Sequence, residues 1–267
     1  MLYNTVLASA IQQHESVISA LKSPALNIQA VCDKGLVRDN NEDALSVGGY
    51  FLRDEALDLT VTTPDDGFFY LLVSDGMGGH EKGEEASRFA LDEIQEQLSF
   101  HHVKPDSFED DIREAARYIN FKLNGTAAEQ GQALPMGCTL TGVIWHYGRT
   151  WLVNAGDSRT YRFRDGMLRQ LTTDETERGI TGNPDASKLL LNCLGGGAEG
   201  RLAVNDLDGK LLEGDVLLIC SDGLCDMVSD EEIEAALSGS AKASDLLRMA
   251  CEAGGVDNIS IILAQVL

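Results

Sequence analysis

Two apolar segments of the chain end in the same three residues, Ser-Asp-Gly. Residues 68–76 read FFYLLVSDG, and residues 216–223 read VLLICSDG. A single Asp-Gly pair is an ordinary turn signal. Two identical endings predict instead that two buried strands deliver carboxylates to a common place. Gly76 and Gly223 are expected to let the backbone turn sharply there, because glycine has no Cβ.

Acidic residues also stand at three other expected strand boundaries. RDNNED (38–43) follows the first strand, NAGDSR (154–159) joins two strands, and VDN (256–258) precedes the last. Crowded carboxylates repel one another and resist ionisation, so a site built from them needs cations. Oxygen ligands favour hard ions, magnesium or manganese, over zinc. The sequence therefore predicts a divalent-metal site at the strand ends.

Strand signals dominate the chain, and most are rich in β-branched and aromatic residues. Asp165-Gly166 and Tyr147-Gly148 are expected to turn hairpins between neighbouring strands. The expected strands are 28–32, 68–74, 139–146, 150–155, 159–164, 216–221 and 259–267.

Four helices are expected beside these strands. One spans 84–98 with a single apolar stripe. The spacing of Asp106 and Glu109 predicts a capped helix to about Leu123, and Ser229 with Glu232 predicts another to about Leu237. The last spans 244–253 and stops at two glycines.

Hairpins in series with two long central helices predict an α+β fold. We expect a layered α-β-β-α sandwich of two antiparallel sheets flanked by helices, with parallel βαβ winding as the alternative. No fixed-period repeat or low-complexity tract divides the chain, and it has only five prolines. Residues 28–267 are therefore predicted to form one domain, and residues 1–27 an N-terminal helical extension whose helix ends before Pro24.

Charge and cysteine usage narrow the possible partners. With 43 acidic and 21 basic residues the net charge is -22, which argues against nucleic acid and anionic membranes and favours a cationic substrate segment. The six cysteines form no CxxC pair, a pattern typical of reduced thiols. The start of the chain lacks a basic signal-peptide region, and no apolar run is long enough to span a membrane. A cytoplasmic monomer is expected.

Several short motifs together resemble one family. RDNNED, DGMGGH followed by GEEAS, GCT, NAGDSR, SDGLCD and a late DN stand in the order found in metal-dependent serine/threonine protein phosphatases of type 2C (PPM), in their bacterial form. The resemblance covers about residues 28–267. It implies hydrolysis of phosphoserine and phosphothreonine in proteins by a hydroxide that bridges two metal ions. The substrate would be a phosphorylated protein, namely a serine/threonine kinase or its target, so that the chain would reverse the kinase reaction.

The resemblance also implies the roles of individual residues. Arg38 would grip the substrate phosphate, and Asn258 would orient its neighbouring ligand. The alternative for Arg38 is a surface ion pair with Asp39 or Glu42. Two manganese or magnesium ions would be held by Asp43, Asp75, Asp222, Asp257, the main-chain carbonyl of Gly76 and, through a water, Glu42. A third, weaker ion would involve Asp157 and Asp226 in addition to Asp222.

The chain departs from the family pattern in two places. Many eukaryotic relatives carry a histidine thought to protonate the leaving group where this chain has Met77, so the general acid is either a metal-bound water or His80. His80 has a loop or structural role as its alternative. The flap between 171–176 and 189–197 is short, with Glu175 and Asn192 where bacterial relatives often have histidine and arginine. The resemblance therefore does not predict the choice of substrate.

Three other functions compete with a metal-dependent protein phosphatase. A cysteine phosphatase is excluded because none of the six thiols has the required His, Asn or Arg neighbours. Another phosphoesterase of the same fold, acting on a phosphorylated regulator, stays open. A catalytically silent phosphatase fold that serves as a binding module also stays open. The enzyme is favoured because a binding module has no need for all of Arg38, Asp43, Asp75, Asp222 and Asp257.

Overall fold

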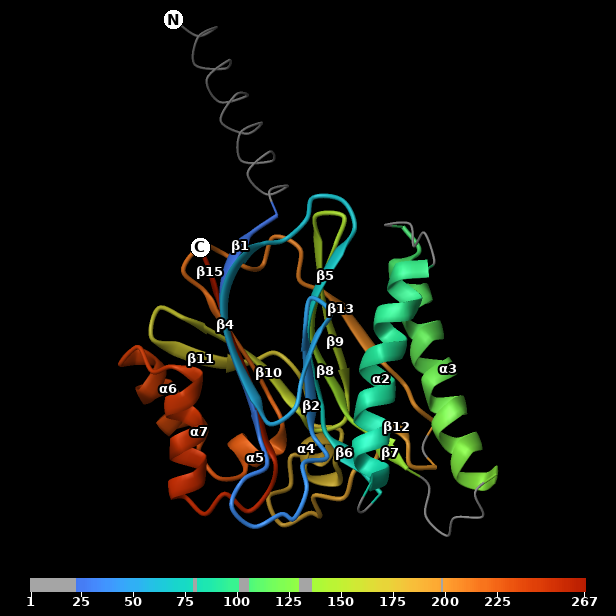
Figure 1. Ribbon diagram of the computed structural model, residues 1–267. Coiled ribbons are helices and arrows are strands. Elements are labelled where there is room, and N and C mark those ends of the chain that lie inside the picture. Colours follow the sequence, from blue (N-terminus) through green and yellow to red (C-terminus); the bar gives the residue numbers. More distant parts are fainter. Residues whose placement is uncertain (1–22, 79–80, 101–105, 130–135, 198) are drawn as a thin grey trace, which may run out of the picture.

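The computed structural model describes residues 23–267 apart from 79–80, 101–105, 130–135 and 198 (Figure 1). The expected N-terminal helix falls almost wholly on residues 1–22, outside the described part of the chain. His80 also lies outside it. Neither expectation is therefore compared with the structure.

One six-stranded sheet contains both ends of the described chain. Its order is β11-β10-β14-β15-β1-β4, and all neighbours are antiparallel. Its strands are β1 (Ala25–Asp33), β4 (Glu55–Thr62), β10 (Arg159–Arg164), β11 (Met167–Gln170), β14 (Val216–Cys220) and β15 (Ile259–Val266).

A second six-stranded antiparallel sheet lies against the first. Its order is β13-β9-β8-β5-β2-β3. Its strands are β2 (Ala44–Val47), β3 (Tyr50–Leu52), β5 (Phe68–Ser74), β8 (Leu140–His146), β9 (Arg149–Ala155) and β13 (Ala203–Asp206). A small third sheet joins β12 (Leu194–Gly195), β7 (Gly137–Cys138) and β6 (Gly76–Met77).

Helices cover the outer face of each large sheet, as Figure 1 shows. The second sheet is covered by α2 (Glu81–Phe100) and α3 (Phe108–Glu129), and the first by α5 (Asp222–Cys225), α6 (Asp230–Ser238) and α7 (Ala243–Glu252). The short α4 (Glu177–Thr181) lies in the flap. The four layers confirm the expected α-β-β-α sandwich.

Alternation along the central strands explains why they are apolar throughout. Leu71 of β5 and Leu217 of β14 face the core between the two sheets. Their neighbours point the other way, so that Leu72 packs under α2 and α3 while Leu218 packs under α5, α6 and α7. Successive strand residues face opposite sides of a sheet. A strand buried on both faces therefore reads as a continuous hydrophobic run.

The hairpins and one helix cap confirm local expectations. Asp165 and Gly166 turn β10 into β11 with φ angles of 52° and 78°, and the turn at 147–148 is built the same way. Ser229 forms a reciprocal capping box with Glu232. Asp106 is not the cap of α3, because that helix begins at Phe108 and Ser107 Oγ contacts Asp111 instead.

Several elements were not expected. β1 begins at Ala25, three residues before the predicted strand start at 28. Its first three residues, which pair with β4, therefore lie inside the predicted extension. The strands that were missed are β2, β3, β4, β6, β7, β12 and β13, and the missed helices are α4 and α5. No helix of the described chain is both long and apolar enough to cross a bilayer, and all six cysteines are free thiols.

Candidate metal centre

The predicted aspartates directly precede or follow strands at one end of the sandwich, where Figure 1 shows β6 and α5, opposite the C-terminus. The second sheet supplies Asp43, just before β2, Asp75, between β5 and β6, and Asp157, in the turn from β9 to β10. The first sheet supplies Asp222, the first residue of α5 after β14, and Asp257, just before β15. The two Ser-Asp-Gly endings therefore come from facing sheets, and both lie at the same end of the sandwich.

The serine before Asp222 joins the two sheets. Ser221 Oγ donates to Asp43 Oδ2 at 2.6 Å and accepts from the backbone N–H of Ser260 at 3.0 Å. Its counterpart Ser74 donates instead to the Thr139 carbonyl oxygen at 2.6 Å. The sequence analysis missed this function of Ser221, although the repeated serine was the available signal.

Asn258 holds the loop that carries Arg38 and Glu42. Its Oδ1 accepts from the backbone N–H of Glu42 at 2.8 Å, and its Nδ2 donates to the carbonyl oxygens of Lys34 and Asn40, both at 2.9 Å. Its own N–H donates to Asp257 Oδ1 at 2.8 Å. The amide thus ties the acidic loop after β1 to the start of β15.

The two glycines of the Ser-Asp-Gly endings serve close packing. Neither Gly76 nor Gly223 has a positive φ angle, so it is the space around each glycine, not its backbone conformation, that excludes a side chain there. A Cβ on Gly76 would lie 1.9 Å from the carbonyl oxygen of Gly83, and a Cβ on Gly223 would lie 2.0 Å from that of Asn258. Only glycine lets the two strand ends approach α2 and β15 so closely.

Burial and mutual repulsion oppose ionisation of these carboxylates. Burial, together with the charges of Asp222 and Asp257, raises the pKa of Asp43 to about 7, although the hydrogen bond from Ser221 lowers it. Burial and the neighbouring carboxylates raise the pKa of Asp75 well above its usual range. Such carboxylates stay charged only when a cation compensates them.

Asp222 and Asp157 show the same effect. Burial, followed by repulsion from Asp257 and Asp226, raises the pKa of Asp222 to about 6. Burial and the charge of Asp222 raise the pKa of Asp157 to about 7. These aspartates therefore repel one another electrostatically and form a single cluster of charge.

The chemistry of this cluster fits a hard cation. Among the described residues, Asp43 Oδ1 and Asp222 Oδ1 are buried without a hydrogen-bond partner, and a buried oxygen without a partner is costly. No three His, Cys, Asp or Glu side chains of the described chain are already arranged to hold an ion. Bound cations would therefore require some carboxylates to exchange their present protein partners.

Arg38 provides one of these partners. Its Nη2 lies 2.6 Å from Asp257 Oδ2, and its side chain is 48% exposed. The arginine is thus paired with a predicted metal ligand, not with Asp39 or Glu42, which were its alternative partners. It stands at the solvent edge of the cluster, where an incoming anion can reach it.

The flap is anchored beside Asp157. Glu175 Oε2 accepts from the backbone N–H of Gly156 at 2.8 Å and from Asn192 Nδ2 at 2.7 Å. Thr176 caps α4 through Gly179 N. The two residues that depart from the family pattern therefore bond to each other and fix both ends of the flap.

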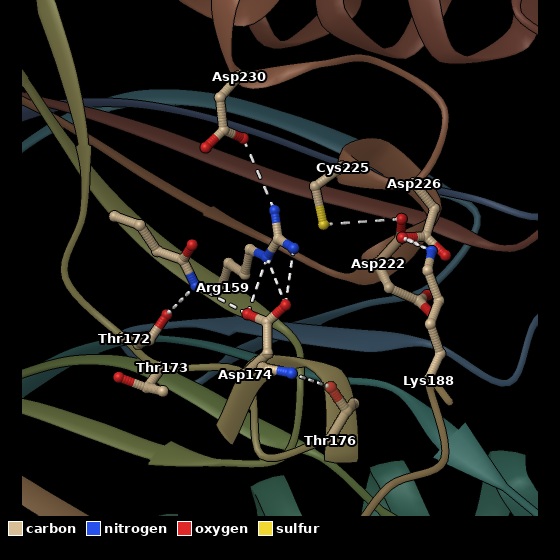
Figure 2. A network of polar contacts seen from close by, with 12 residues as sticks. Arg159, Thr172, Thr173, Asp174, Thr176, Lys188, Asp222, Cys225, Asp226 and Asp230 are labelled. Atoms are coloured by element: carbon tan, nitrogen blue, oxygen red, sulfur yellow. Dashed lines mark hydrogen bonds and ion pairs between the residues drawn. The ribbon is translucent and has the colours of Figure 1, made fainter. Parts of the chain in front are cut away.

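Two further polar contacts in this region were not foreseen (Figure 2). Arg159, at the start of β10, binds both carboxylate oxygens of Asp174 and lies 3.6 Å from Asp230. Lys188 of the flap pairs with Asp226. Sequence spacing carries no signal for either pair, because each joins segments that only the folded chain brings together.

Comparisons with known proteins agree with this arrangement. Residues 49–258 match the sequence profile of the family described as Protein phosphatase 2C. The serine/threonine protein phosphatase PstP of Mycobacterium tuberculosis is 32% identical over 261 residues, which cover 91% of this chain but only 45% of PstP. The serine/threonine phosphatase stp of Listeria monocytogenes is 30% identical over 252 residues, which cover 87% of this chain and 93% of stp. The chain thus spans less than half of PstP and nearly all of stp.

A solved structure shows the same fold. The catalytic domain of PstP, in complex with two manganese ions, superposes with a TM-score of 0.69 at 32% identity, covering 91% of this chain and 99% of that domain. The α-β-β-α sandwich places the chain in the same structural class as this phosphatase domain. Within that class, the chain belongs to the protein phosphatase 2C family.

The raised pKa values predict how stability depends on pH in the metal-free protein. Between the unfolded value of about 3.9 and about 7, the folded state holds more protons than the unfolded state, so the free energy of unfolding falls as pH rises. We expect the melting temperature in chelator to fall across this range, and Asp157→Asn to flatten the slope. Asp66→Asn, an exposed control in the β4–β5 turn, should leave the slope as it is. If Asp157→Asn left the fall of melting temperature with pH unchanged, the raised pKa of Asp157 would be contradicted.

Proposed function

We propose that the chain is a manganese- or magnesium-dependent phosphatase that removes phosphate from phosphoserine and phosphothreonine in proteins. The observation that carries the proposal is the cluster of buried, mutually repelling aspartates, two with unpartnered oxygens, beside an exposed arginine. The names of the relatives and the two manganese ions of the PstP catalytic domain support it.

Two cations would be held at the centre of this cluster. Their ligands would be Asp43, Asp75, Asp222, Asp257, the carbonyl oxygen of Gly76 and, through a water, Glu42. Asp157 and Asp226 would contribute to a third, outer ion. Bound cations would supply the charge that acidifies water and stabilises negative charge on the phosphoryl group. Oxygen ligands fit both manganese and magnesium.

The protein's own groups would position the substrate. Arg38 would exchange Asp257 for the phosphate, because a planar guanidinium binds two phosphate oxygens at once. Asn258 would keep the Arg38 loop in register through its bonds to Lys34 and Asn40. The proton donor to the leaving group would be either a metal-bound water or His80.

Cysteine chemistry has no part in this proposal. Burial raises the pKa of both Cys32 and Cys138 to about 12, which keeps these thiols protonated and poor nucleophiles.

The net charge supports the proposed substrate, and the free thiols support the proposed location. The net charge of -22 favours phosphorylated segments that also carry basic residues, since like charges repel at long range. A serine/threonine kinase or its target would be the substrate. Free cysteines throughout support a cytoplasmic location. We further propose a monomer, with residues 28–267 as the phosphatase domain and residues 1–27 as an extension.

Release of inorganic phosphate from a phosphothreonine peptide tests this proposal. With manganese present, we expect turnover of phosphoserine and phosphothreonine peptides. The competing function, a silent binding module, predicts that the folded protein binds the phosphopeptide without releasing phosphate. That outcome would overturn the enzyme.

A further inference from the structure

Lys188 reaches from the flap into the outer edge of the aspartate cluster. Its Nζ lies 2.5 Å from Asp226 Oδ1, and Figure 2 shows the lysine side chain extending toward Asp226 with Asp222 beside them. Asp222 begins α5 and Asp226 follows its last residue, so one helical turn separates them and places both on one side of the helix. The ammonium group thus neutralises charge at the outer end of the cluster.

The backbone of the flap holds Lys188 in this place. An antiparallel bridge joins Thr176 to Leu190, and the N–H of Glu177 donates to the Leu189 carbonyl oxygen at 3.2 Å. Arg178, the basic residue of α4, points back into the flap, where its Nε donates to the Ala186 carbonyl oxygen at 3.1 Å. Between Glu177 and Leu191, Lys188 is therefore the described cation that contacts the cluster.

If the Lys188–Asp226 contact were an ordinary surface ion pair, it would contribute only about 0–1 kcal/mol to stability. The setting of Asp226 makes the difference. It faces Asp222, whose Oδ1 is buried without a partner in the described chain, and it adds to the repulsion that Asp157 experiences. A cation at Asp226 thus compensates the negative charge that Asp226 adds next to Asp222 and Asp157.

We propose that Lys188 is an internal competitor for a divalent cation at Asp226. The inference rests on the proposed metal centre and deepens it. The ammonium occupies the outer carboxylate until an ion takes its place, and binding of that ion releases the lysine from Asp226. Occupancy of the outer site and attachment of the flap to α5 are therefore mutually exclusive.

Manganese binding isotherms of the full chain, measured by calorimetry at low salt, test this competition. Lys188→Gln keeps the length of the side chain and removes the charge. We expect it to tighten the weakest manganese site about tenfold, which equals about 1.4 kcal/mol. In an Asp226→Asn background the same substitution should have no effect on that site. Lys210→Gln, an exposed lysine in the β13–β14 connection, controls for the loss of one positive charge.

Flap protection gives a second readout that does not depend on activity. Hydrogen exchange of residues 176–191 should speed up when manganese fills the weakest site of the wild-type protein, because the lysine then leaves Asp226. In Lys188→Gln, exchange should be fast at every manganese concentration.

The possible failures are distinguishable. Identical isotherms for the wild type and Lys188→Gln, with manganese bound in both, would overturn the competition and leave the metal centre intact. An equal gain in manganese affinity from Lys188→Gln in the Asp226→Asn background, or from Lys210→Gln in the wild type, would also overturn the competition. The effect would then be one of general electrostatics. No manganese bound by folded wild-type protein would overturn the metal centre and this inference together.

Discussion

Asp222→Asn is expected to reduce phosphatase activity at saturating manganese at least about a hundredfold, a loss of about 2.7 kcal/mol of transition-state stabilisation. Asparagine keeps the shape of the side chain but carries no charge, so cations at the centre of the cluster would lose an anionic ligand. The chain should nevertheless fold. Asp222 destabilises the metal-free protein when ionised, because burial and repulsion raise its pKa to about 6.

The variant should therefore melt at the same temperature as the wild type, or higher, in chelator near neutral pH. Steady-state hydrolysis of a phosphothreonine peptide measures the first effect, and calorimetry measures the second. Asp66→Asn, which changes an exposed aspartate in the same way, serves as the control. More than about a tenth of wild-type activity in Asp222→Asn would contradict the ligand role, since loss of a metal ligand costs several kcal/mol.

Arg38→Ala should weaken phosphate binding and spare metal binding. Hydrogen bonds to charged groups contribute about 1.5–3 kcal/mol, so we expect the inhibition constant of inorganic phosphate to rise about 10- to 100-fold. Manganese affinity should stay the same or increase, because Asp257 loses the arginine that contacts it at 2.6 Å.

Two matched substitutions sharpen this prediction. Arg38→Lys keeps the charge but loses the planar fork, and it should recover only part of the phosphate affinity. Arg248→Ala, which removes an exposed arginine of α7 that pairs with Glu252, should change neither constant. A large drop in manganese affinity in Arg38→Ala would contradict the placement of Arg38 at the phosphate.

The long strands and the cluster were predictable from sequence because their signals are local. β5 and β10 have the bounds expected of them, since each is rich in aromatic residues and is bounded by turn residues. The aspartates could be located because each directly follows or precedes such a strand. Short strands were harder. β2 and β3 contain only four and three residues, too few for a pattern to stand out.

β4 shows a different limit. Its sequence EALDLTVT alternates between exposed and half-buried positions. This period-two pattern is visible in the sequence, but no strand was predicted from it. Its pairing with β1, by contrast, forms only after the chain has passed through β2 and β3 of the other sheet. Contacts of this kind have no local signal.

The partners of the cluster were also beyond sequence. Lys188 and Asp226 are 38 positions apart, and Arg38 and Asp257 are separated by 219. The resemblance named Arg38 as a phosphate ligand, but only the fold shows which carboxylate it contacts. The close packing of Gly76 against Gly83 was likewise not predicted from the sequence.

The most direct test of the central claim, that the aspartate cluster is the metal centre of a phosphatase, is metal dependence of phosphate release. The purified chain of residues 1–267 would be stripped with chelator, assayed on a phosphothreonine peptide, and assayed again as manganese is returned. We predict no release after stripping and full recovery with manganese. Release that persists in excess chelator, or that stays absent when manganese is restored to folded protein, would contradict the account.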